Sequence, residues 1–149
     1  MNKFIAILLF AFCTTSMAEV FDKNTLFELK ASNKDKRWVL LLWSQDCEPC
    51  LDELDMLSKL KSNMLGQVVL LNTNDASVLI DEGKQIIEQL KLSSTTNFFF
   101  TPGKGKKLKY LLDPDWSGEL PRSYFVDEDG NMLAKSGMIK EKHLKAWIK

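Results

Sequence analysis

The feature that most constrains the fold of this sequence is the run WVLLLW at residues 38–43, which is apolar at every position. Six residues suit a strand better than a helix, and a strand with no polar position has to be covered on both faces. The run therefore predicts a central strand of a sheet. The next residues, SQDCEPC, place Cys47 and Cys50 directly after this strand.

A helix is predicted to follow, with the cysteine pair at its N-terminus. Apolar residues recur at three- and four-residue intervals, and Gly66 stands where a helix would stop; the apolar positions are Cys50, Leu54, Leu57, Leu60 and Met64. Residues 68–71 predict a second buried strand, and residues 80–90 a second helix that is weakened by Gly83. The order strand, helix, strand, helix predicts a parallel α/β core.

The remaining segments predict shorter elements within the same domain. These are a helix over 25–31, a strand over 97–100, a hairpin over 123–126 and 132–135, and a closing helix over 141–148. The lysine-rich segment GKGKK and its neighbours lack phosphate-loop spacing, so Lys104, Lys106, Lys107 and Lys109 are interpreted as a solvated loop. A chain of 149 residues, 45% of them hydrophobic, is enough for one domain with its own core.

The N-terminus has the pattern of a secretory signal. Lys3 precedes an apolar run over residues 4–12, and Ser16 and Ala18 are small residues at the positions that signal peptidase reads. The run is much shorter than the about 20 residues that span a bilayer. We expect a signal peptide over residues 1–18, cleavage after Ala18, and an exported, periplasmic domain over residues 19–149, without stable membrane insertion.

Removal of residues 1–18 would change both the charge and the cysteine content. It takes away one lysine and no acid, which leaves 19 basic and 20 acidic residues and gives no reason to expect nucleic acid or an anionic membrane as a partner. It also removes Cys13, so Cys47 and Cys50 become the only cysteines and no disulfide framework is possible. Lipidation of Cys13 is the less favoured alternative, because bulky Phe12 precedes it.

The cysteine pair itself admits three interpretations. A helix N-terminus stabilises a thiolate at Cys47 and places Cys50 one turn on, within disulfide reach, which favours redox chemistry. A zinc site normally takes four ligands, and the only histidine, His143, is distant and interpreted as solvated. A four-residue disulfide ring would stabilise the fold very little. We therefore expect a redox pair, with no metal and no cofactor.

Two segments together resemble a known family. WSQDCEPC at 43–50, with Glu53 three residues later, and LPRSYFVDEDG at 120–130 resemble segments of thioredoxin-like proteins. The resemblance is closer to exported TlpA-like thiol-disulfide oxidoreductases, some of which serve cytochrome c maturation, and it covers about residues 24–148. It implies a thioredoxin-like α/β fold: a central mixed sheet flanked by helices, with an extra helix and strand between the cysteine helix and the proline strand.

The resemblance also implies roles for individual residues. Pro121 would be a cis-proline opposite the disulfide, and the backbone of Leu120 would be free to pair with an extended client segment. Trp43, Glu48 and Pro49 would complete the client-binding surface around the cysteines.

Three further positions bear on the chemistry. Leu41 stands where thioredoxin has a buried aspartate, so proton transfer to and from Cys50 needs another group. Glu53 is the candidate, either as that group or simply as a glutamate favoured in the first turn of a helix. Arg122 replaces the usual small residue after the proline, and it either shapes client choice or is solvated.

The charge around the cysteines predicts a direction of electron flow. Residues 38–58 contain no basic side chain and five acidic ones, which opposes thiolate formation and favours a reductant; they are Asp46, Glu48, Asp52, Glu53 and Asp55. We therefore expect a monomeric low-potential reductant of client disulfides, supplied by a membrane electron donor, with apocytochrome c-type polypeptides as one client class. The alternative is a non-catalytic binding module that holds a client or a soft metal.

Overall fold

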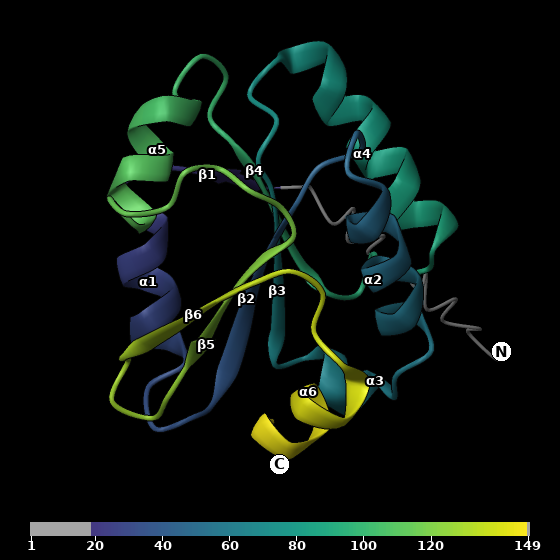
Figure 1. Cartoon of the computed structure of the whole chain (residues 1–149), viewed down its shortest axis with the longest axis vertical. Helices are drawn as coiled ribbons and strands as arrows, with labels where there is room; N and C mark the ends of the chain where they lie inside the picture. The colour runs from purple at the N-terminus through teal and green to yellow at the C-terminus, as the bar shows by residue number, and fades with distance from the viewer. Residues whose placement is uncertain (1–18, 149) are drawn as a thin grey trace, which may run out of the picture.

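The computed structural model describes residues 19–148, which form a six-stranded mixed sheet between two layers of helices (Figure 1). The sheet has the order β1-β4-β3-β2-β5-β6. The strands β1, β4, β3 and β2 are parallel to one another, β5 is antiparallel to β2, and β6 is antiparallel to β5. The strands are β1 (Glu19–Phe21), β2 (Trp38–Trp43), β3 (Val68–Asn72), β4 (Thr96–Phe100), β5 (Arg122–Val126) and β6 (Met132–Ser136).

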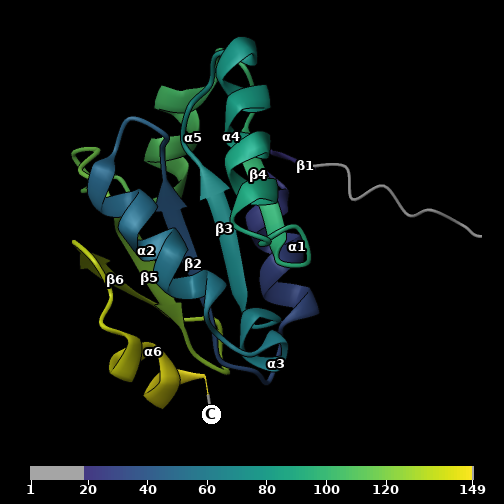
Figure 2. The same cartoon turned by 90° about the vertical axis from the view of Figure 1, so that its right-hand side faces the viewer.

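The helices divide between the two faces of the sheet, as Figures 1 and 2 show. They are α1 (Thr25–Ser32), α2 (Glu48–Ser58), α3 (Ser62–Leu65), α4 (Ser77–Gln89), α5 (Gly105–Leu112) and α6 (Glu141–Trp147). The α2, α3, α4 and α6 helices contribute to the core on one face, and α1 and α5 contribute to the core on the other. None of the helices within residues 19–148 is long and apolar enough to span a bilayer.

The expected α/β class is correct, and the apolar run is the central strand that was predicted. Side chains alternate along β2, so Val39, Leu41 and Trp43 enter the core beneath α2, while Trp38, Leu40 and Leu42 enter the opposite core. All six are buried. The continuous apolar pattern therefore reflects two covered faces, and it places the C-terminal end of β2 at the start of α2.

The single helix predicted from Cys50 to Met64 is wrong in one respect, because it is broken in two. The α2 helix ends at Ser58, Lys61 is extended with ψ 146°, and α3 begins at Ser62. The Ser58 hydroxyl donates to the Asp55 carbonyl, which competes with helix continuation. The break turns the chain back to the sheet, where the Val39 N–H donates to the Gln67 carbonyl at 2.9 Å.

Two elements were missed, and one of them corrects the expected lysine loop. The α5 helix contains Lys106, Lys107 and Lys109. Its buried side chains are Leu108 and Leu112, which are four residues apart and lie on one face of the helix. The short β1 strand pairs with β4 in parallel and is too brief for any periodicity to be visible. The other predicted elements lie within three residues of their expected bounds.

Gly83, which lowers the helix propensity of α4, has a packing reason to be there. The residue is buried, and a Cβ atom at this position would lie 2.8 Å from both Asn72 Nδ2 and Phe99 Cε1. Only glycine lets α4 approach β3 and β4 this closely. This close approach brings the start of α4 near the loop that precedes the cysteines.

Candidate active site

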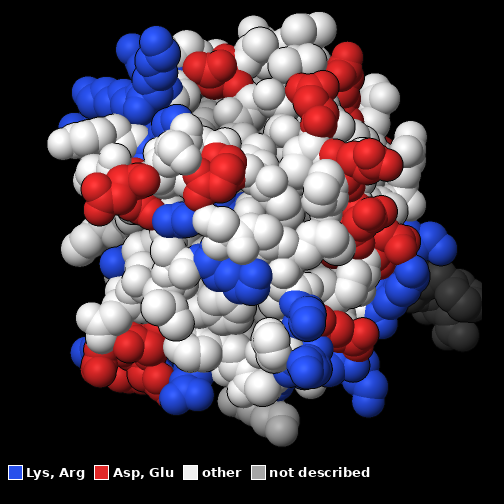
Figure 3. Space-filling view, in the orientation of Figure 1, with Lys and Arg blue, Asp and Glu red and all other residues white. Residues whose placement is uncertain are grey.

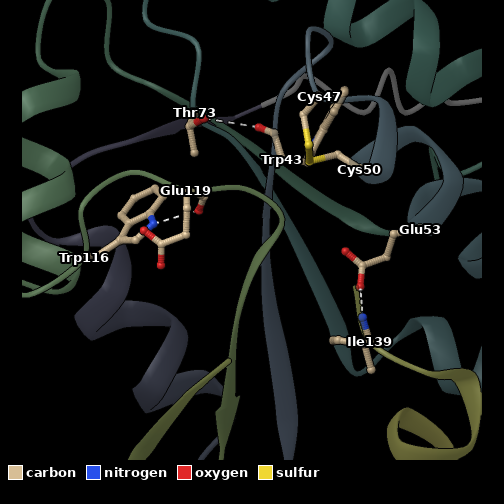
Figure 4. The surroundings of a disulfide bond; sticks show 8 residues. All are labelled: Trp43, Cys47, Cys50, Glu53, Thr73, Trp116, Glu119 and Ile139. Atoms are coloured by element: carbon tan, nitrogen blue, oxygen red, sulfur yellow. Dashed lines mark hydrogen bonds between the residues drawn. A yellow bond between two sulfur atoms is a disulfide. The ribbon is translucent and has the colours of Figure 1, made fainter. Parts of the chain in front are cut away.

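Cys47 and Cys50 form a disulfide at the junction of β2 and α2 (Figure 4). Cys47 is the N-cap residue of the 11-residue α2 helix, and its carbonyl accepts the N–H groups of Cys50 and Leu51 at 2.9 and 3.2 Å. The Cα atoms of the two cysteines are 5.2 Å apart. The helix dipole and the unpaired N–H groups at this end favour a thiolate at Cys47 once the disulfide is reduced.

The two cysteines differ in exposure. Cys47 is half-buried, whereas Cys50 is fully buried and packs with Leu54 and Leu57 in the core beneath α2. Glu48 and Pro49, which lie between the cysteines, are both exposed. A partner protein can therefore reach Cys47 and the two intervening residues, while Cys50 can be reached only from within the protein.

The loop before Cys47 is held by a network of neutral amides that the sequence analysis did not identify. Gln45 Oε1 accepts from Asn72 Nδ2 at 3.0 Å and from Asn74 Nδ2 at 2.7 Å, and Gln45 Nε2 donates to the Leu79 carbonyl at 2.9 Å. Asn72 is completely buried. Gln45 thus ties the cysteine loop to the end of β3 and the start of α4.

The Leu120–Pro121 peptide bond is cis, as the resemblance implied. Leu42 of β2 pairs with Arg122 of β5, so one residue further along this antiparallel register Pro121 comes beside Trp43, at the end of β2. The Pro121 carbonyl accepts the Gly137 N–H at 2.8 Å. Within residues 19–148 the N–H and C=O of Leu120 make no hydrogen bond, which leaves them able to pair with an extended peptide.

Glu53 is buried on α2, three residues after Cys50, and its carboxylate is directed toward Ile139. Its Oε1 accepts the Ile139 N–H at 2.5 Å, whereas its Oε2 is buried without a partner among the described residues (Figure 4). Burial raises the pKa of Glu53 to about 7, although the Ile139 N–H and the charge of Lys135 both act to lower it. The residue lies in the second turn of α2, so the first-turn interpretation of Glu53 is wrong.

The overall architecture is shared with several solved structures. StoA from Bacillus subtilis has 23% identity and a TM-score of 0.57, with 80% of this chain and 87% of that chain covered. A thiol:disulfide interchange protein of the thioredoxin family from Chlorobium tepidum has 15% identity and a TM-score of 0.61, with 80% and 85% covered. The chain has a thioredoxin-like fold.

A third similar structure is a secreted disulfide oxidoreductase from Mycobacterium tuberculosis that is homologous to E. coli DsbE. It has 17% identity and a TM-score of 0.54, with 79% of this chain and 84% of that chain covered. No protein-family model matches the sequence, and no curated protein matches it either.

Within this thioredoxin-like fold, Trp43 lies under the site and not on its surface. Its side chain is 1% exposed and belongs to the same core cluster as Cys50. Its carbonyl accepts the N–H and the hydroxyl of Thr73 at 2.9 and 3.3 Å (Figure 4). The expected contact between Trp43 and a client is wrong for this reason; the side chain supports the cysteine loop from below.

Arg122 is neither solvated nor placed to contact a client directly. Its guanidinium pairs with Asp113 at 2.5 Å and with Glu119 at 3.1 Å, and it lies 5.4 Å from the centre of the Tyr124 ring. The side chain is only 13% exposed. These contacts tie the segment before the cis-proline to β5, so Arg122 fixes the position of the Leu120 backbone.

Acidic side chains gather on the side of the molecule formed by α2 and α4 (Figure 3). Asp46, Glu48 and Asp52 are exposed near the disulfide and make no ion pair within residues 19–148. His143 is exposed on α6. Among the residues that the structure describes, no three His, Cys, Asp or Glu side chains are grouped to hold a metal ion.

Proposed function

We propose that this protein is an exported thiol-disulfide oxidoreductase that reduces disulfides in partner proteins through a Cys47/Cys50 cycle. The observation that carries this proposal is the asymmetry of the disulfide. Cys47 is half-buried at a helix N-terminus, whereas Cys50 is fully buried in the core on the same helix as the buried carboxyl group of Glu53. Attack on a partner and release from it need these two different environments.

The catalytic cycle starts from the reduced dithiol. The Cys47 thiolate attacks a client disulfide, which forms a mixed disulfide and expels the second client sulfur as a thiolate. Cys50 then loses its proton to Glu53 and attacks the Cys47 sulfur. The bond between Cys47 and the client breaks, and its electron pair leaves on the client sulfur. Two electrons have then moved to the client, and the protein holds the Cys47–Cys50 disulfide seen here.

The surroundings of Cys47 support a defined client-binding mode. Exposed Glu48 and Pro49 lie between the cysteines, and the unpaired backbone groups of Leu120 can accept an extended client segment beside the cis-proline Pro121. Pairing with the backbone of Leu120 requires no particular client side chain. The specificity for clients would then come from the shape and charge around Cys47.

The reductant direction rests on the acidic residues near Cys47. Asp46, Glu48 and Asp52 disfavour a thiolate at Cys47, whereas a strong oxidant has to stabilise its thiolate. The reduction potential of a strong oxidant is about −120 mV, and that of thioredoxin is about −270 mV. Exposed carboxylates are screened by salt, so their contribution is modest. Equilibration with glutathione and dithiothreitol buffers should give a potential below about −180 mV, the value of protein disulfide isomerase. A higher potential would refute the direction.

Export would require the N-terminal segment, whose structure lies outside the described residues. A protein that stays reduced in an oxidising compartment needs a dedicated donor, and we propose a membrane electron carrier in that role, with the protein itself a monomer. Apocytochrome c-type polypeptides are the client class that the TlpA-like resemblance implies. The intact mass of exported material should correspond to a chain that begins at Glu19, and a lipid adduct on Cys13 would contradict this.

Two experiments separate this function from a binding module. The reduced protein should catalyse insulin disulfide reduction, and the Cys47→Ser variant should not, because the attacking sulfur is missing. The Cys50→Ala variant should accumulate mixed disulfides with client proteins through Cys47, which mass spectrometry can identify. Stable association with clients without any turnover in the wild-type protein would favour the binding module.

A further inference from the structure

Ser123, the second residue of β5, is a buried polar group that the proposed cycle has not yet used. Its side chain is completely buried, and its hydroxyl has no hydrogen-bond partner among the described residues. A buried hydroxyl without a partner costs free energy, so such groups are rare without a reason. Its neighbours in the sheet point to that reason.

The sheet register places Ser123 on the face of the cysteine pair. Ser123 is paired with Leu41 of β2, and paired residues project their side chains to the same face. Leu41 shares a core cluster with Cys50.

Glu53 Oε2 is another buried oxygen without a partner among the described residues. The other carboxylate oxygen of Glu53 is bonded to the N–H of Ile139, and Gly137, two residues earlier, is bonded to the Pro121 carbonyl. Pro121 is two residues from Ser123. These two hydrogen bonds tie the segment 137–139 both to Glu53 of α2 and to the residue before β5.

The charged group that faces Glu53 from the β5–β6 hairpin is Lys135 of β6, the residue paired with Ser123. Its ammonium donates to the carbonyls of Ser136, Gly137 and Met138 at 3.2, 3.3 and 3.1 Å. These bonds shape the turn that presents the Ile139 N–H to Glu53. Lys135 has no bond to Glu53 itself, so the free carboxylate oxygen is left for another donor.

We propose that the Ser123 hydroxyl and Glu53 Oε2 are bridged by one buried water molecule, and that Ser123 is a positioning residue for the proton acceptor of Cys50. A buried water needs two to four polar partners. The two unpartnered oxygens would be two of them, and the thiol of reduced Cys50 would be a third. The proposal rests on the function proposed above and adds a defined hydrogen-bond donor behind the resolving cysteine.

The bridge has a defined part in the release step. When Cys50 attacks the mixed disulfide, its proton passes through the water to Glu53 Oε2, while the Cys50–Cys47 bond forms and the client thiolate departs. Ser123 changes neither its proton count nor its charge; its hydroxyl holds the water and the carboxylate oxygen in line with the thiol. The protonated Glu53 afterwards returns its proton to solvent or to the departing client thiolate.

The first test measures Glu53 in the oxidised protein, where the cysteines cannot titrate. Carbon-13 NMR of labelled glutamate carboxyl groups should show that Ser123→Ala raises the pKa of Glu53 by about half a unit or more, because a hydrogen bond to the ionised form is lost. Ser123→Thr, which retains a hydroxyl, should restore the wild-type value. An unchanged titration of Glu53 in Ser123→Ala would overturn the proposal, whatever the activity of the protein.

The second test measures release of the mixed disulfide. Ser123→Ala should slow release about fivefold, the equivalent of one ordinary hydrogen bond, and it should have no further effect in a Glu53→Gln background. Multiplicative effects of the two changes would overturn the proposal. Thr95→Val is the matched control, because Thr95 also has a buried hydroxyl without a partner and lies in the loop before β4. It should change neither the Glu53 pKa nor the release rate.

Discussion

The two sides of the disulfide are held in place by opposite kinds of polar contact. On the cysteine side, neutral amides centred on Gln45 fix the loop before Cys47. On the cis-proline side, the ion pairs of Arg122 with Asp113 and Glu119 fix the segment before Pro121. The proline side therefore depends on charge, whereas the cysteine side does not. Because Arg122 and Asp113 are mostly buried, salt screens their ion pair only weakly.

Two glutamates show the same contrast in their protonation. Burial raises the pKa of Glu53 to about 7. Hydrogen bonds from Ser117 and Ser136, together with the charge of Arg122, lower the pKa of Glu119 to about 2. Glu53, on the cysteine side, can thus exchange a proton near neutral pH. Glu119, on the proline side, keeps its charge and its ion pair with Arg122.

The largest effect is expected from breaking the charged side. Arg122→Ala leaves Asp113, whose side chain is 17% exposed, without its cation, and should cost about 3 kcal/mol of unfolding free energy. The variant should also bind clients less tightly, since the Leu120 backbone loses its support. Urea denaturation of the oxidised protein measures the first effect, and the KM for a disulfide substrate measures the second.

Arg37→Ala is the control for that change, because the Arg37–Glu128 pair is about half exposed. Its loss should change the unfolding free energy far less than Arg122→Ala does. The pKa of Cys47 should be the same in both variants as in the wild-type protein. A shifted Cys47 pKa in Arg122→Ala would show that the two sides of the site are not independent.

The next effect concerns Glu53. Its replacement should stabilise the folded protein at alkaline pH, whereas Arg122→Ala should destabilise it. A folded-state pKa of about 7, above the ordinary 4.5, gives a contribution to stability that is complete below 4.5 and lost as the pH rises through about 7. The wild-type protein should therefore lose about 3 kcal/mol between pH 4 and pH 8 from this group. Glu53→Gln should abolish this loss, as measured by denaturation at each pH.

Glu48→Gln provides the comparison for Glu53, because Glu48 is exposed in the first turn of the same helix. Its pH profile between 4 and 8 should match that of the wild-type protein. If Glu53→Gln left the alkaline loss in place, the loss would have to come from another group and the burial argument for Glu53 would be wrong.

A smaller effect is expected from the neutral side. Gln45→Ala removes the acceptor of the Asn72 amide inside the core and should cost about 2 kcal/mol. The cost should not depend on salt, and the rate of Cys47 alkylation should change because its loop is released. Gln85→Ala, at an exposed position of α4, should do neither. A normal alkylation rate in Gln45→Ala would reduce Gln45 to a purely structural role.

The smallest effect should appear in acid. Because the pKa of Glu119 is lowered, its contribution to stability is complete above pH 4.5 and lost as the pH falls through about 2. The group is 42% exposed, so the contribution should be well under about 1 kcal/mol and should weaken with salt. Denaturation of Glu119→Gln between pH 2 and pH 5, at low and high salt, measures it. Equal acid sensitivity in the variant and the wild-type protein would show that Glu119 does not help Arg122 to hold the segment before Pro121.

Local sequence patterns predicted most of the fold and the central part of the site. The apolar run at residues 38–43, the cysteine pair after it and the proline at residue 121 lie where their patterns indicated. These features are set by neighbours within a few residues, because strand and helix periodicity, helix starts and proline geometry are local properties. The break before Lys61 was missed although the Ser58 hydroxyl competes locally with the helix, and α5 was missed because its lysines were interpreted as a solvated loop although Leu108 and Leu112 recur at helical spacing.

The sequence by itself determined where the reactive sulfurs lie and which of them a helix start favours as the nucleophile. Only the tertiary structure decided what surrounds them. Burial raises the pKa of Glu53, and the N–H of Ile139, which is 86 residues away, acts to lower it; the cysteine loop depends on Asn72, which is 27 residues from Gln45. Burial and hydrogen bonding between such distant segments arise only when the chain folds, and no local pattern encodes them.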